Sequence, residues 1–410
     1  MSSQAEWTWL IYMAGDNNLE GAGKEDLDEM QIVGSDSKIN IVVQFDTEQN
    51  KTTRYLVEKN NLKVLQEMPG VNCGDPKVLT DFIKWGTKNY PANYYLVNVW
   101  NHGGGWENLP ADYNWENVRS SNPLKQSKIK QFRRALFVTT IKKIHRKIRS
   151  SPNPERLIAM DVGSQDYLDN QELRKAIFDA LPNGRKIDIL GCDACLMNMV
   201  EICYENKDVA DYMVGSEEVE PGSGWPYTMI LKKLAVNPEM TPRELSKVVT
   251  QEYGKYYDNE GDKIADQFVT QSAIDLAQVN SLADSVNELA EILIKDLNNV
   301  LPGVTVAKDK AQRFSTPEYI DLLSFCEQLT KRLPNNNEVK DAVKKISDKI
   351  NGPTSSLVIA NVTWGDTVKD ANGVSIYFPT AQNYSADYSD LLFSKDCKWN
   401  EFLTKFFSAE

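Results

Sequence analysis

The sequence predicts an α/β fold in which helices cover both faces of a mostly parallel β-sheet. In the first half of the chain, short apolar runs rich in β-forming residues alternate with helical patterns. Within each run the hydrophobicity is nearly continuous rather than alternating, which is typical of strands buried on both faces. Turn-forming residues such as Pro182-Asn183-Gly184 separate a helical pattern from the next run. Together these observations indicate an open sheet with helices on both sides.

The first half accounts for four strands and three helices of this sheet. The expected strands are residues 9–14, 39–46, 94–100 and 187–192. The expected helices are residues 19–32, 78–89 and 170–181. Asn170 is the expected N-cap of the third helix, with Glu172 in its first turn.

The second half predicts a fifth strand at residues 212–216 and then a Gly- and Pro-rich stretch at 220–227. Helices are expected at residues 241–257 and 279–297, because apolar residues recur there with helical spacing. Two late strands are expected at 357–363 and 373–378. We therefore expect a catalytic-type domain at residues 1–227, with an insertion at about 107–157. An accessory α/β region at 228–410 should pack on it.

Bulk composition excludes several classes of protein. The chain has 410 residues and a net charge of −12, and no apolar run approaches the roughly 20 residues that cross a bilayer. Six scattered cysteines make a disulfide framework or a structural zinc site a poor fit. No signal peptide is seen, so we expect a cytoplasmic protein, or a secreted one whose leader was removed. An acidic chain also disfavours nucleic-acid and membrane partners, and we expect a monomer.

A basic segment interrupts this acidic sequence. Residues 119–149 contain eleven Lys or Arg, and no Asp or Glu occurs from Arg119 through Pro154. Part of the segment has an amphipathic pattern, so a solvated basic helix is one explanation. An anionic surface partner is a minority alternative. His145 lies among these like charges and is expected to be a surface residue.

Two segments that follow expected strands carry residues suited to thiol chemistry. Residues 101–106 (NHGGGW) follow one strand, and Asp193-Ala194-Cys195 follows another. Open α/β sheets place their active sites beyond the carboxyl ends of the strands. Cys195 precedes a helical pattern, whose positive end would favour the thiolate. His102 could exchange the proton, and the backbone N–H groups of Gly103 and Cys195 could form an oxyanion hole.

Each of these residues also has a simpler explanation. A Cys after a buried strand is usually a small core residue, and a His before three glycines can sit in a tight turn. Cys192 and Cys195 also match the C-x-x-C spacing of redox enzymes. However, Cys192 is expected to lie within its strand, and the redox explanation gives the His102 loop no role.

The paired blocks NHGGGW and GCDACLMNMVE resemble the clostripain family of cysteine peptidases, relatives of caspases, gingipains and legumain. The segments IYMAGDNNLE, VGSEEVEPGSGWPY, GVSIYFP and KWNEFL also resemble family segments. The resemblance implies a caspase-like three-layer α/β/α fold and a Cys-His dyad, with the family's His at His102 and its nucleophile at Cys195.

The same resemblance implies cleavage after Arg or Lys, selected by an acid in the S1 pocket at the position of Asp193. A helix-capping carboxylate is the competing explanation for Asp193. Residues 215–225 could supply a strand edge for the substrate backbone, with Ser216 and Trp225 as binding residues, although Trp225 is as well explained as a packed core residue. The resemblance also implies a zymogen that cuts itself within the basic segment, where Arg134, Lys143, Lys147 and Arg149 are candidate sites.

Calcium is associated with the family, but the sequence contains no EF-hand loop, so calcium rests on the resemblance alone. We predict that no cofactor is required. The function that follows is a cysteine endopeptidase acting on proteins or peptides with a basic P1 residue. The alternatives are a catalytically silent peptide-binding relative, or a thiol-disulfide oxidoreductase that uses Cys192 and Cys195.

Overall fold

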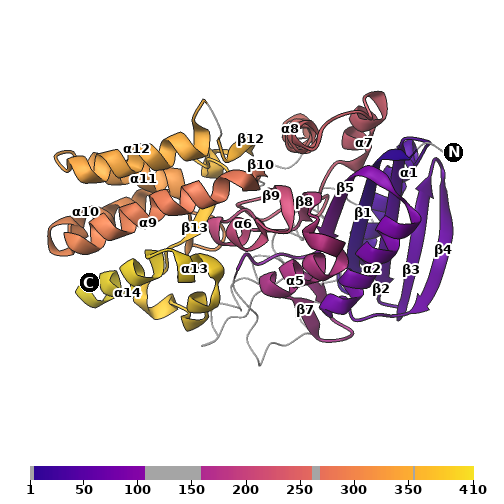
Figure 1. Ribbon diagram of the computed structural model, residues 1–410, viewed down its shortest axis with the longest axis horizontal. Helices are drawn as coiled ribbons and strands as arrows, with labels where there is room; N and C mark the ends of the chain where they lie inside the picture. The colour runs from indigo at the N-terminus through magenta and orange to yellow at the C-terminus, as the bar shows by residue number, and fades with distance from the viewer. Residues whose placement is uncertain (1–3, 107–157, 261–267, 354–355) are drawn as a thin grey trace.

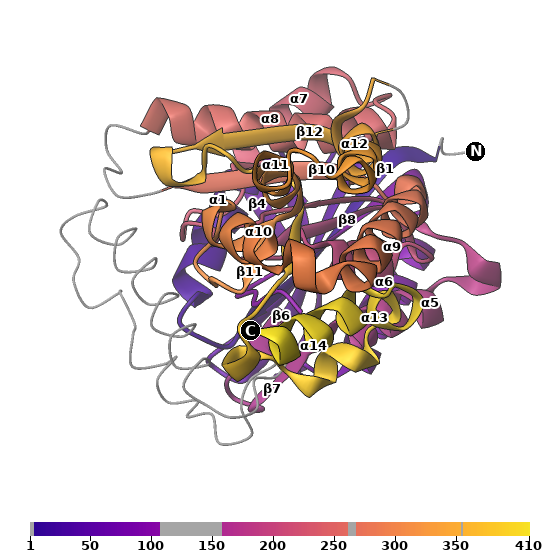
Figure 2. The same ribbon diagram turned by 90° about the vertical axis from the view of Figure 1, so that its left-hand side faces the viewer.

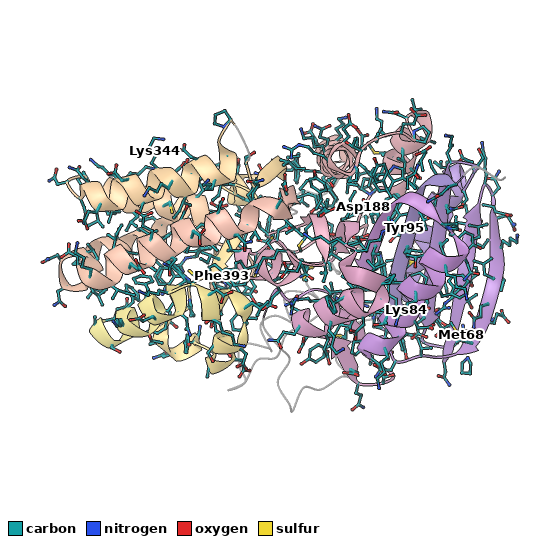
Figure 3. The ribbon with its side chains drawn as sticks, in the orientation of Figure 1. Met68, Lys84, Tyr95, Asp188, Lys344 and Phe393 are labelled. Carbon is teal, nitrogen blue, oxygen red and sulfur yellow. The ribbon has the colours of Figure 1, made fainter. Side chains whose placement is uncertain are left out.

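The computed structural model describes residues 4–106, 158–260, 268–353 and 356–410. The whole of the expected insertion, with the basic segment and its candidate processing sites Arg134, Lys143, Lys147 and Arg149, lies outside these residues. His145 lies outside them as well. The described residues form an elongated molecule in which Lys344 and Met68 lie toward opposite ends (Figure 3).

A nine-stranded sheet forms one end of the molecule, in the order β12-β10-β9-β8-β5-β1-β2-β3-β4 (Figure 1). Its five central strands are parallel to one another: β9 (Ala210–Gly215), β8 (Ile187–Asp193), β5 (Ala92–Trp100), β1 (Ala5–Gly15) and β2 (Ile39–Thr47). Antiparallel pairings extend it on both sides: β3 (Lys51–Glu58), β4 (Asn61–Pro69), β10 (Val269–Asp275) and β12 (Val358–Trp364). The predicted mostly parallel sheet is therefore present.

Both faces of the sheet are covered, which explains the continuous hydrophobicity of its strands. In β1, Leu10 and Tyr12 belong to one apolar cluster and Trp9 and Ile11 to the other, because successive side chains point to opposite faces. The first cluster contains residues of α2 (Pro76–Asn89), α5 (Asn170–Ala180) and α6 (Val200–Asn206). The second contains residues of α1 (Glu20–Val33), α7 (Tyr227–Val236) and α8 (Pro242–Glu260).

The C-terminal half adds a group of helices that lies at the far end from β4 in Figure 1 and faces the viewer in Figure 2. The helices are α9 (Val279–Lys295), α10 (Leu297–Lys310), α11 (Leu322–Arg332), α12 (Asn337–Asn351), α13 (Leu392–Asp396) and α14 (Trp399–Ala409). Two small sheets pair β11 (Tyr319–Asp321) with β13 (Ser375–Tyr377) and β6 (Ile158–Asp161) with β7 (Asp166–Leu168). Short 3-10 helices lie at Pro182–Gly184, Leu276–Gln278, Asp366–Val368, Ala381–Asn383 and Ala386–Asp390.

Three details differ from the sequence-based expectations. The expected domain boundary near residue 228 would divide the strands of the large sheet between two domains, because β10 and β12 come from the C-terminal half. The expected strand at 373–378 pairs in a small separate sheet. Helix α5 is capped by Asp169 rather than Asn170, because the Asp169 carboxylate and Glu172 form a reciprocal capping box. Among the described residues, no helix is long and apolar enough to cross a membrane.

Candidate active site

The register of β5 and β8 brings the two predicted loops together. Trp100 at the end of β5 pairs with Asp193 at the end of β8, and the backbone N–H of Asn101 donates to the Asp193 carbonyl across 3.3 Å. His102 and Cys195 follow these positions by two residues each. The prediction that both emerge at the same edge of the sheet is confirmed.

Gly103 is the point of closest approach between the loops. A β-carbon built there would lie 2.2 Å from the carbonyl oxygen of Cys195 and 2.8 Å from its nitrogen. Any side chain would therefore collide with backbone, which is why glycine is needed next to His102. The backbone N–H of Gly103 also faces the Cys195 thiol closely enough to lower the pKa of the thiol.

The Cys195 thiol is buried, with 2% of the residue exposed. Burial raises its pKa well above the ordinary value for cysteine, and hydrogen bonds from the backbone N–H groups of Glu220 and Gly103 offset only part of that shift. The Glu220 nitrogen lies 3.2 Å from Sγ. In this state the thiol is neutral at pH 7.

The expected helix dipole does not act on this thiol. Helix α6 begins at Val200, and Leu196 has a φ of +63°, which interrupts helical geometry directly after Cys195. The helical pattern read from residue 196 onward therefore starts four residues late.

His102 is buried with 3% exposed, and its Nε2 lies 2.8 Å from Oδ1 of Asn18. Burial lowers the pKa of the imidazole from 6.5 to about 4. The imidazole is therefore neutral at pH 7 and able to accept a proton, as a general base requires.

A small pocket with a cavity volume of about 20 Å³, room for about one water molecule, lies directly beside Cys195. Its walls come from the ends of β5 and β8, from the start of α1 and from the segment after β9. The lining residues are Leu19, Ala22, Trp100, Asn101, Asp193, Ala194, Cys195, Glu220, Pro221, Gly222 and Gly224. The pocket is thus a candidate binding site for the substrate residue next to the scissile bond.

Asp193 lies in this pocket with its carboxylate held in place. The Tyr227 hydroxyl donates to its Oδ2 across 2.7 Å, and the Trp225 N–H lies 3.4 Å from the same atom. Because α6 begins at Val200, the alternative role of Asp193 as a helix cap is not what the structure shows. Burial raises the pKa of Asp193 to about 6.

Glu220 forms a carboxyl pair with Asp193. Burial and the Asp193 charge raise the pKa of Glu220 well above its ordinary value, and Glu220 donates a hydrogen bond to Asp193. Burial and the charge of Asp193 also raise the pKa of Asp26, whose carboxyl group accepts a hydrogen bond from the Trp100 indole across 2.7 Å. The pair therefore carries one negative charge near neutral pH, placed on Asp193.

Ser216 and Trp225 were expected to bind the substrate, but neither residue lines the pocket. The Ser216 hydroxyl is buried and lies 2.9 Å from that of Thr270. The Trp225 ring is fully buried with a centroid 6.5 Å from that of Trp9, so the packed-core explanation is the one that fits. Strand β9 also offers no free edge, because β8 and β10 pair with its two sides. Trp225 contributes its backbone N–H to Asp193 instead.

Cys192 lies within β8 and is fully buried, and neither Cys192 nor Cys195 is in a disulfide. Burial also raises the pKa of the Cys192 thiol well above its ordinary value. A redox dithiol needs an accessible, low-pKa thiol. The geometry of Cys192 therefore argues against the oxidoreductase alternative.

Asp46, Cys73 and Asp161 are the one group of three described side chains whose ligand-type atoms all lie within 4.8 Å of one another. The group does not fit calcium, which takes roughly six to eight oxygen ligands. It offers a thiol and two carboxylates, and both oxygens of Asp161 already accept backbone N–H groups, from Cys73 and Ser164.

Asn18, Glu220 and Tyr227 are site residues that sequence reasoning missed. Asn18 follows the end of β1, so the strand-end rule that found His102 could also have found it. Glu220 belongs to an acidic stretch with no distinctive spacing. Tyr227 gives no sequence signal, because its role depends on where the segment after β9 folds.

Comparison with known proteins gives concordant results. The family model described as the clostripain family matches residues 11–136 and 146–406. Clostripain from Hathewaya histolytica is 23% identical, and the alignment covers 93% of this chain and 76% of that protein.

Solved structures are similar over nearly the whole chain. A secreted C11 cysteine protease from Bacteroides thetaiotaomicron bound to an irreversible peptide inhibitor has a TM-score of 0.64 at 19% identity, covering 96% of this chain and 99% of that one. An inactive zymogen C11 protease from Parabacteroides distasonis has a TM-score of 0.66 at 20% identity, covering 97% and 99%. The predicted caspase-like α/β/α fold class is confirmed.

Proposed function

The chain belongs to the clostripain family and is a cysteine endopeptidase, and from this premise we propose that it hydrolyses peptide bonds with Cys195 as nucleophile and His102 as acid–base group. The observation that carries the proposal is the contact of Gly103 with the Cys195 backbone and thiol, which supports a working pair made of the two loops. All the groups come from one chain, so a monomer suffices.

The proposed reaction follows from the neutral resting state. His102 takes the thiol proton as Sγ forms a bond to the scissile carbonyl carbon, because the buried thiol does not ionise by itself at pH 7. Backbone N–H groups of Gly103 and Cys195 stabilise the resulting oxyanion. The imidazolium then gives its proton to the leaving amine, and the acyl thioester is hydrolysed by a water that His102 deprotonates.

We further propose that the enzyme cleaves after Arg or Lys. Asp193 presents a fixed carboxylate in a pocket that adjoins Cys195, and Glu220, which shares a proton with Asp193, lines the same pocket. A guanidinium or ammonium group is costly to desolvate unless a carboxylate pairs with it. When such a group enters, Glu220 can release its shared proton, so that both carboxylates face the cation.

We also propose that the chain is made as a zymogen and cuts itself within residues 119–149, where Arg134, Lys143, Lys147 and Arg149 are candidate sites. Two points support this proposal. The segment offers many bonds that a basic-specific peptidase would cleave, and one structural neighbour is described as an inactive zymogen. The proposed chemistry uses only groups of the protein, so no cofactor is needed.

The test is hydrolysis of fluorogenic peptides with Arg, Lys, Asp or Leu at P1 by the wild type, Cys195→Ala and His102→Ala, with chain integrity followed on gels. The proposal predicts cleavage after Arg or Lys by the wild type alone, and fragments of the wild-type chain alone. Equal activity of His102→Ala would contradict the dyad. Cleavage after Leu or Asp would contradict the specificity.

A further inference from the structure

We infer that Asn18 is a positioning residue for the acid–base group, holding the His102 imidazole in the tautomer that presents Nδ1 to the thiol. The inference rests on the proposed role of His102. It depends on one hydrogen bond, 2.8 Å between Nε2 of His102 and Oδ1 of Asn18, both of which are buried.

The direction of this hydrogen bond follows from the chemistry of the two groups. An amide oxygen has lone pairs and no hydrogen, so it can only accept. Nε2 of His102 must therefore carry the hydrogen and donate. Because the buried imidazole is neutral at pH 7, its second nitrogen, Nδ1, then has no hydrogen and offers a lone pair. Nδ1 is thus the atom that can take the Cys195 proton.

Two asparagine side chains next to Asn18 and His102 fix the positions of these residues relative to each other. Asn17, directly before Asn18, donates through Nδ2 to the carbonyls of Ala14 and Met160, each across 2.8 Å. Asn101, directly before His102, donates through its Nδ2 to the same two carbonyls. The same two carbonyl groups therefore hold the loops after β1 and β5, and this fixes the distance between Asn18 and His102.

The loop of Asn18 is further fixed at its other end. Oδ1 of Asn17 accepts from the backbone N–H of Leu19 across 2.9 Å, so the residues on both sides of Asn18 are held. Such a fixed acceptor keeps the imidazole from rotating between its two ring orientations, at little cost in entropy during the reaction. An amide also leaves the imidazole pKa low, whereas a carboxylate in the same place would raise it.

The test compares four variants of the full-length chain: Asn18→Ala, Asn18→Asp, His102→Ala and the control Asn206→Ala, which removes a buried amide whose Nδ2 donates to the Ile202 carbonyl within α6 across 2.9 Å. The chain has only two histidines, so imidazole ¹⁵N NMR resolves them, and His145→Gln assigns the spectrum. The wild type should show His102 protonated at Nε2. Asn18→Ala should lose this single tautomer and lower kcat/KM by about 10- to 100-fold, through kcat rather than KM.

Asn18→Asp has nearly the same size as the wild type and keeps the inference testable if the alanine variant unfolds. Its carboxylate should raise the imidazole pKa by about one unit or more, so one limb of the pH profile of kcat/KM shifts upward. Asn206→Ala should lower the melting temperature without changing the tautomer or the shape of the pH profile.

The outcomes separate the two claims. If His102→Ala is inactive but both Asn18 variants keep the wild-type tautomer and pH profile, the inference about Asn18 is wrong and the dyad stands. If His102→Ala stays active, the proposed dyad itself fails. If Asn206→Ala reproduces every effect of Asn18→Ala, the effects come from a general loss of stability and the positioning role of Asn18 is wrong.

Discussion

Gly103 and Cys195 are packed so closely that the two loops of the active site share one rigid junction. The position of a β-carbon at residue 103 falls 2.2 Å from the Cys195 carbonyl oxygen, well inside the distance that real atoms adopt. The backbone N–H of Gly103 also lowers the pKa of the thiol. The relative placement of Cys195 and His102, the proposed nucleophile and base, therefore depends on the absence of a side chain at residue 103.

Replacing Gly103 by alanine should abolish most activity. The methyl group would push the His102 loop away from Cys195 and turn the Gly103 N–H from its acceptor, and loss of one such donor costs roughly 100- to 1000-fold in kcat. Steady-state kinetics with the preferred peptide measures the loss, and circular dichroism checks that the fold is retained.

Gly184→Ala is the matched control. Gly184 has a positive φ of +70°, unlike Gly103, and a β-carbon there meets nothing within 4 Å. This variant should lose about 1 kcal/mol of stability from backbone strain and keep its activity. Full activity of Gly103→Ala would contradict the account of the junction.

Replacing Asp193 by asparagine should remove the preference for basic residues. The substitution keeps the shape of the side chain and removes the charge, which is worth about 1.5–3 kcal/mol in a charged hydrogen bond. We expect kcat/KM for Arg peptides to fall by roughly 10- to 100-fold. An equal loss with Leu at P1 would show that Asp193 acts on the structure rather than on specificity.

The selectivity for Arg should depend on pH through Asp193. Burial raises its pKa to about 6, so the carboxylate is charged above that pH and becomes neutral below it. The ratio of kcat/KM for Arg to that for Leu should therefore fall about tenfold between pH 7 and pH 5. Taking the ratio cancels the titration of His102 and Cys195. A ratio that is constant with pH, or that rises as the pH falls, contradicts the assignment.

Cys192→Ala should leave peptidase activity within about twofold of the wild type. The thiol is buried inside β8 and takes no part in the proposed reaction, so the change should cost about 1 kcal/mol of stability. Peptide kinetics and a thermal melt measure both effects. Loss of activity in a folded Cys192→Ala protein, with Cys195 still reactive, would favour dithiol chemistry.

Chelation of calcium should leave the activity unchanged. The proposed reaction uses only side chains and backbone groups, and the group formed by Asp46, Cys73 and Asp161 suits calcium poorly. Assays with EGTA and with added calcium test this directly. A fall in kcat that calcium restores would show that a calcium site supports the enzyme.

Much of the fold could be predicted because its central strands are buried on both faces. The runs at β1, β2, β5 and β8 have a continuous apolar pattern that only such burial explains. The β3–β4 hairpin was missed because its exposed strand β4 lacks that pattern. Strand β10 was missed as well, because polar residues such as Gln271 and Ser272 are buried in it by long-range hydrogen bonds.

The sequence could predict only those site residues that directly follow the end of a strand. His102 and Cys195 follow two neighbouring strands, and rare residue types drew attention to them. Their hydrogen-bond partners depend on tertiary distances: Glu220 reaches the thiol from a segment 25 residues away, and Tyr227 reaches Asp193 from the first turn of α7. The prediction that a helix starts directly after Cys195 was wrong, because Leu196 has a left-handed backbone conformation that the spacing of apolar residues does not reveal.

The most direct test of the central claim is to treat the protein with an irreversible peptide inhibitor carrying Arg at P1 and to locate the adduct by mass spectrometry. The account predicts one adduct, on Cys195, which is lost in Cys195→Ala and His102→Ala and forms far more slowly with Leu at P1. An adduct on Cys192 or another residue, or equal labelling of the His102→Ala protein, would contradict it.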